Sequence, residues 1–127
     1  GGAAPAAPLQ ARLAATPEPA RAGRPGTLTV TVENTGATPQ RQVVLNVLLP
    51  PANLQPRADS IQPRPTLVQP SGIVQIPIAA ELAPGAREAV IIPFQALAQG
   101  NAVIQAQVTS ADAAPAEFSK TLLINPR

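Results

Sequence analysis

The chain has 127 residues, the length of one domain, with a formal net charge of +2 and no Cys, His, Met, Trp or Tyr. These absences exclude the usual zinc and haem ligands, a thiol nucleophile and a Ser-His-Asp triad. The arginines are spread along the chain without interleaved aromatic residues, which argues against nucleic-acid binding.

Residues 1–25 are rich in Ala, Pro and Gly and are typical of an extended arm or linker. Within the arm, the segment 8–16 shows the period-two pattern of a half-buried strand. A short helix is the competing interpretation, but Pro8 and Pro17 leave too few residues between them for a stable isolated helix. We therefore expect a strand whose inner face is formed by Leu9, Ala11, Leu13 and Ala15.

From Gly26 onward the sequence predicts short strands separated by turns. The clearest is 26–34, where Leu and Val alternate with Thr, and the following Asn-Thr-Gly has turn chemistry. Residues 52–70 are predicted to be loop with at most one short edge strand. The further strands are predicted at 41–49, 73–80, 87–97, 101–110 and 118–125. Pro77 and Pro93 interrupt two of them and should lie at a sheet edge or a bulge.

This pattern predicts an all-β fold. We expect an immunoglobulin-like antiparallel β-sandwich of about seven strands over residues 26–125, with an extended N-terminal arm. Each large side chain contributes about 1.5–3 kcal/mol when fully buried, so an aliphatic core suffices without disulfides. The predicted core is Leu28, Val30, Val32, Leu45, Val47, Ile76, Val90, Ile92, Phe94, Ile104, Val108 and Leu122.

The segments TLTVTVENTG, VVLNVLLPPANL, ELAPGAREAVIIPF and VIQAQVTS resemble the conserved repeat called domain-of-unknown-function family eleven. The resemblance covers about residues 24–124. It implies an immunoglobulin-like sandwich in an exported bacterial or archaeal surface protein, usually as a stalk or array repeat. This chain has Val47 and Gln105 where the family often has Asp and Asn, and only Asp112 remains of an acidic stretch. The family's cation bridging between repeats is therefore not carried over to this chain.

The remaining acidic and nucleophilic residues form no recognisable reactive constellation. The carboxylates do not show the spacing of a glycosidase pair or a calcium loop, and they are expected on the solvated surface: Asp59, Glu81, Glu88, Asp112 and Glu117. Lys120 is expected on the exposed face of a strand. The serines have no His or nearby Lys to activate them, and no glycine-rich phosphate loop occurs. We therefore expect no enzyme activity, no cofactor, no metal and no small-molecule substrate.

The sequence begins Gly1-Gly2 without an initiator Met. Either the chain was excised from something longer or a secretory signal peptide was removed, and we favour the second. The protein is then expected outside the cell or on its surface. No stretch approaches the roughly 18 consecutive apolar residues of a membrane span.

Together, these expectations predict that the protein is a non-enzymatic structural module of an extracellular or cell-surface assembly. In its sharper form it is a filament subunit that donates segment 8–16 head-to-tail to the next copy, with Leu9, Ala11, Leu13 and Ala15 at the contact. One alternative is a passive spacer or stalk domain of a larger surface protein. Another is an adhesin or glycan-binding module, which the lack of Tyr and Trp disfavours. The expected partners are copies of the chain itself or neighbouring surface domains.

Overall fold

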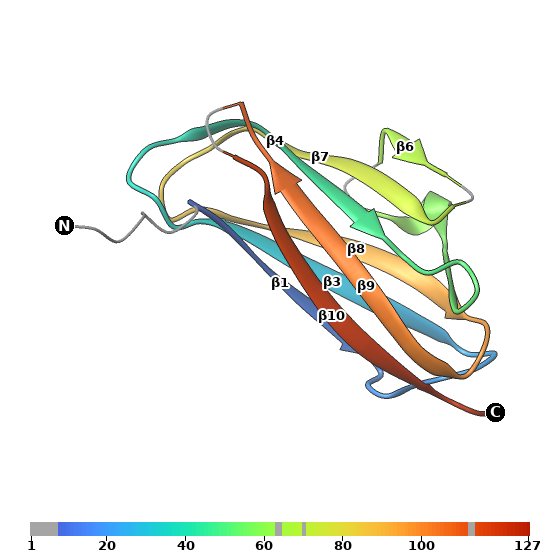
Figure 1. Cartoon of the computed structure of the whole chain (residues 1–127). Coiled ribbons are helices and arrows are strands. Elements are labelled where there is room, and N and C mark those ends of the chain that lie inside the picture. Colours follow the sequence, from blue (N-terminus) through green and yellow to red (C-terminus); the bar gives the residue numbers. More distant parts are fainter. Residues whose placement is uncertain (1–7, 63–64, 70, 112–113) are drawn as a thin grey trace.

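Two β-sheets pack face to face and confirm the all-β sandwich (Figure 1). The structure is a computed structural model that describes residues 8–62, 65–69, 71–111 and 114–127. One sheet has the order β1-β3-β8-β5, from β1 (Leu9–Thr16), β3 (Pro25–Asn34), β8 (Arg87–Ala96) and β5 (Leu54–Pro56). The other has the order β2-β10-β9-β4-β7-β6, from β2 (Ala20–Arg21), β10 (Ala116–Asn125), β9 (Gly100–Thr109), β4 (Gln40–Leu48), β7 (Ile73–Leu82) and β6 (Leu67–Val68).

A short 3₁₀ helix, η1 (Ala58–Ser60), lies between β5 and β6. Within the described ranges, no helix is long and apolar enough to cross a membrane.

Strict alternation places aliphatic side chains between the sheets. In β3, Leu28, Val30 and Val32 are fully buried, whereas the intervening threonines are only half-buried. All twelve predicted core residues are buried. The other large buried side chains are Leu9, Val43, Leu49, Leu54, Ile61, Val74, Leu82 and Ile124. Gly26 leaves room for the central aromatic ring, because a Cβ at this position would lie 2.6 Å from an atom of Phe94.

The described part of the N-terminal arm is built into both sheets. The strand predicted at 8–16 is β1, and it pairs antiparallel with β3 over eight residues, from Leu9 opposite Asn34 to Thr16 opposite Thr27. Leu9 and Ala15 are buried, and Ala11 and Leu13 pack partly buried against the core. The sandwich therefore includes residues that the sequence assigns to an arm ending at residue 25. Residues 1–7 of that arm lie outside the described ranges.

The first and last strands run in the same direction. Only residues 17–19 separate β1 from β2, and β2 pairs parallel with the end of β10. Figure 1 shows that β1 begins at one end of the sandwich and β10 finishes at the other. The described chain thus enters and leaves the sandwich at opposite ends.

Asn34 joins the two sheets at the end where β1 begins. Its side chain is fully buried, and its Nδ2 donates to the carbonyl oxygens of Thr38 at 2.8 Å and Leu82 at 2.9 Å. Its Oδ1 accepts a hydrogen bond from the Gly36 N–H at 3.0 Å. One amide therefore ties the end of β3 to the approach to β4 and to the end of β7. The sequence predicted only a turn here.

We expect Asn34→Ala to destabilise the fold. The substitution leaves the buried Leu82 carbonyl without its Asn34 donor, and each unsatisfied buried group costs about 1–3 kcal/mol. Urea unfolding should show a lower midpoint with an unchanged slope. The matched control is Thr35→Ala, which removes only an exposed hydroxyl bond to Pro8 and should change stability by less than about 0.5 kcal/mol. Equal losses in the two variants would contradict this role of Asn34.

Candidate functional site

The acidic residues considered for catalysis or metal binding come from separate places in the fold. Asp59 lies in η1, Glu81 near the end of β7, Glu88 at the start of β8 and Glu117 at the start of β10. Among the described residues, no three Asp, Glu, His or Cys side chains form a group that could hold a metal ion. Asp112 lies outside the described ranges.

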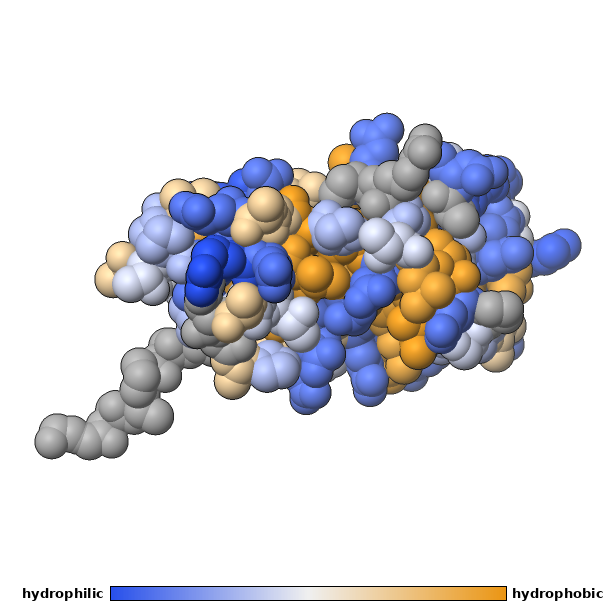
Figure 2. All heavy atoms as spheres, turned by 90° about the horizontal axis from the view of Figure 1, so that it is seen from above, coloured by the Kyte–Doolittle hydropathy of each residue, from blue (hydrophilic) through white to orange (hydrophobic). Residues whose placement is uncertain are grey.

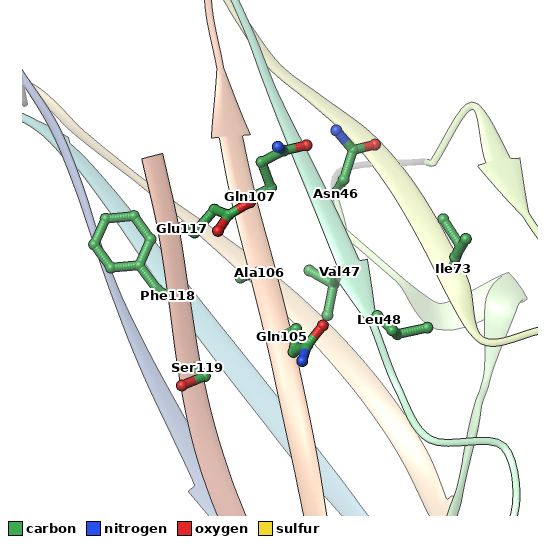
Figure 3. A pocket seen from close by; sticks show the side chains of 10 residues that line it. All are labelled: Asn46, Val47, Leu48, Ile73, Gln105, Ala106, Gln107, Glu117, Phe118 and Ser119. Atoms are coloured by element: carbon green, nitrogen blue, oxygen red, sulfur yellow. The ribbon is translucent and has the colours of Figure 1, made fainter. Parts of the chain in front are cut away.

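An open hollow of about 510 Å³ lies on the outer face of the six-stranded sheet (Figure 3). Side chains of β4, β7, β9 and β10 line it: Asn46, Leu48, Ile73, Gln105, Gln107, Glu117 and Ser119. Phe118 also borders it, and Figure 3 shows its ring turned to the side of β10 on which β1 lies.

The outward side chains of this sheet line up in rows across the strands. One row runs over β10, β9, β4, β7 and β6 and consists of Glu117, Gln107, Asn46, Gln75 and Leu67. The next row contains Ser119, Gln105, Leu48 and Ile73. Directly opposite side chains in a sheet are close enough to interact, so each row is a continuous band of contacts.

The chemistry of these rows suits contact rather than reaction. Amides donate and accept hydrogen bonds but do not titrate, and Glu117 is the one carboxylate of the hollow. A general acid–base pair needs two titratable groups placed within reach of a substrate. The hollow is therefore a candidate recognition surface, which we call the amide face and define by the two rows.

Lys120 provides a second feature of the six-stranded sheet. It follows the same alternation as the buried Leu122 and Ile124, and so points toward the inner side of β10. The prediction that Lys120 lies on an exposed strand face is therefore wrong. Its Nζ lies 2.6 Å from Glu18 Oε1, and their side chains are 22% and 46% exposed. This contact links β10 to the segment between β1 and β2.

An inward-pointing charge lies at an otherwise open strand edge. β2 covers β10 only at Ile124 and Asn125, which leaves the remainder of that edge unpaired in the described part of the chain. Burying a lysine against an added strand would cost free energy, which disfavours edge-to-edge association.

No protein-family model matches the sequence, and no curated protein is found to match it. Solved structures do share its fold. A cohesin module from a Clostridium perfringens family 33 glycoside hydrolase matches with a TM-score of 0.63 and 13% identity, over 95% of this chain and 99% of the module. A CARDB domain from Pyrococcus furiosus, in complex with di-metal ions, gives a TM-score of 0.61 and 11% identity, over 91% of this chain and 86% of the domain.

A mutant Salmonella alpha-2-macroglobulin matches with a TM-score of 0.69 and 23% identity, over 95% of this chain. This chain spans only 7% of that protein. These likenesses show the immunoglobulin-like sandwich, which occurs both as a separate module and as a small part of a much longer chain. Such a fold is compatible with a non-enzymatic surface module.

We expect Lys120→Leu to leave stability nearly unchanged and to promote association. The partly exposed ion pair with Glu18 is worth about 0–1 kcal/mol, so urea unfolding should shift little. The substitution removes the charge that guards the β10 edge, so light scattering should show aggregates that grow with concentration. Thr29→Leu is the control, because it adds the same side chain on the outward face of the four-stranded sheet, away from the β10 edge. Equal aggregation of the two variants would contradict edge protection by Lys120.

Proposed function

We propose that the chain is a non-enzymatic, load-bearing spacer module of an extracellular or cell-surface protein. The observation that carries the proposal is the entry and exit of the chain at opposite ends of the sandwich (Figure 1). A module of this geometry lengthens the protein that contains it by the length of the sandwich. A module whose entry and exit lay side by side would instead turn the chain back on itself and add little length.

The terminal strands are also paired in the direction that resists tension. β1 has eight register pairs with β3, and β10 has nine with β9. A pull at the start of β1 and the end of β10 acts along both strands, so the hydrogen bonds of each ladder share the load. A pull across a ladder would instead break its bonds one after another.

The parallel pairing of β2 with β10 directly connects the segment that follows β1 to the end of the last strand. Ala20 lies opposite Ile124 and Arg21 opposite Asn125. The Ala22 N–H also donates to the Asn125 carbonyl oxygen at 2.8 Å. Tension must therefore break this patch as well before the terminal strands separate.

Two further observations support placing the module at the cell surface. The sequence motifs resemble those of surface-protein repeats, and the fold is like that of a cohesin module from a glycoside hydrolase. A non-enzymatic role agrees with the amide face, which offers contacts and hydrogen bonds but no nucleophile with an activating base.

The filament form of this proposal needs β1 to leave its own sheet. In the structure β1 occupies the edge of β3 that a donated strand from another copy would fill. Exchange therefore requires eight register pairs to open before equivalent pairs form in the neighbour. This cost makes us favour the spacer over the head-to-tail filament.

Pulling experiments on a tandem polyprotein test the load-bearing role. Tension applied ahead of β1 and after β10 of each module should require a high unfolding force, because both terminal ladders are loaded along their length. The control attaches one handle at the N-terminal end and the other through Thr35→Cys, a unique thiol because the chain has no Cys. This geometry pulls Leu9 away from Asn34 and opens the β1–β3 pairs in sequence, so the force should be much lower. Equal forces in the two geometries would overturn the proposal.

Removal of β1 separates the spacer from the donor-strand filament. We expect a chain that starts at Thr16 to be less stable, because the buried side chain of Leu9 alone contributes about 1.5–3 kcal/mol. A synthetic peptide of residues 8–16 should restore that stability, as judged by thermal unfolding. Light scattering of the intact chain should show no open-ended polymer. Polymers of the intact chain that lengthen with concentration, and that disappear on truncation, would instead support the filament.

A further inference from the structure

The outer face of the six-stranded sheet gathers most of the exposed apolar residues. Of the seven large apolar side chains that are exposed in the described ranges, five belong to strands of this sheet: Leu48, Leu67, Ile73, Val103 and Leu123. Figure 2, seen from above relative to Figure 1, shows apolar patches between polar side chains on the upper side of the molecule.

Charges are scarce over the same area. Across the amide face and the adjoining outward residues Val103 and Leu123, Glu117 is the single charged side chain. Two other outward charges of the six-stranded sheet, Arg41 and Glu81, lie opposite each other at the start of β4 and the end of β7, outside the amide face. Depletion of charge together with exposed apolar side chains is typical of the central part of a protein–protein interface.

We propose that the amide face binds the same face of a second copy, about a two-fold axis that runs along β4. The composition suits a copy of itself, because every amide supplies both a donor and an acceptor. A face dominated by one sign of charge would repel its own copy. This interface does not depend on the spacer role and adds a partner to it.

The register of the strands determines which residues would meet. β9 and β7 flank β4, so Gln107 of one copy faces Gln75 of the other. Asn46 and Leu48 lie on β4 itself and face their own counterparts. The amides can then form reciprocal hydrogen bonds, while the paired Leu48 side chains fill the hollow from both sides.

Charge repulsion between the two copies of Glu117, the single carboxylate of the amide face, does not oppose this arrangement. Glu117 lies two strands from β4 on one side, and Leu67 lies two strands away on the other. Glu117 therefore faces Leu67 of the second copy at the rim of the interface. Its two copies are separated by four strand spacings, about 19 Å. At that distance, which exceeds the Debye length of about 8 Å at physiological salt, their repulsion is largely screened.

Sedimentation velocity of the intact chain over a range of concentrations tests the interface. We expect a monomer–dimer equilibrium that stops at the dimer. Leu48→Arg and Leu48→Glu should each remain monomeric, because like charges would meet at the axis. An equimolar mixture of these two variants should dimerise again, because Arg then meets Glu. Only a side chain that faces its own counterpart gives this pattern.

The matched control is Ile91→Arg, which changes a similarly exposed apolar residue on the four-stranded sheet (41% against 36% for Leu48). It should dimerise like the unmodified chain. Asn46→Lys and Asn46→Asp repeat the charge exchange at the second self-facing position, should a Leu48 variant fail to fold by circular dichroism. A chain that stays monomeric at every concentration overturns the proposal. So does a mixture of folded, oppositely charged variants that remains monomeric, or a loss of dimer in Ile91→Arg.

Discussion

Everything in this sandwich depends on keeping aliphatic side chains on one face of each long strand. The chain has no cysteine, and Phe94 is the one fully buried aromatic side chain among the described residues. A slip of one residue in β3 would expose Leu28, Val30 and Val32 together and bury threonines in their place. The Asn34 amide opposes such a slip, because its bonds to Thr38 and Leu82 form only in the observed register. The outward-facing positions do not have to be aliphatic, and the side chains at these positions differ between the two sheets.

The same alternation explains what the sequence could predict. It located the long strands, the strand at 8–16 and the twelve core residues, because period-two burial is a local signal. Pro77 was expected at an edge or bulge and lies opposite Val44, where the β4–β7 register shifts. β2 escaped prediction, and residues 52–70 contain two short edge strands, β5 and β6, where one was expected, since two or three residues carry no period. The amide face escaped for another reason: Gln105 and Gln107 are visible in the sequence, but their alignment with Asn46 and Gln75 depends on which strands pair.

The sequence also could not predict which strand β1 pairs with. Alternation of Leu9, Ala11, Leu13 and Ala15 predicts one buried face but not the molecule whose core receives it. The structure places β1 beside β3 of its own chain, and the contact between Glu18 and Lys120 holds the following segment against β10. Both terminal strands are thus tied to the body of the module. Their open edges are places where another chain could add, and Lys120 lies at the β10 edge.

The proposed dimer and the proposed spacer are geometrically compatible. A two-fold axis along β4 keeps the strand direction the same in both copies, because rotation about a line leaves directions along that line unchanged. In the dimer, both chains would therefore enter at the same end and leave at the opposite end. An axis across the strands would reverse one copy and place the two entry points at opposite ends. Only the parallel arrangement lets two stalks that rise from the same surface pair along their length and share tension, while β1, in the other sheet, remains outside the contact and β10 contributes only to its rim.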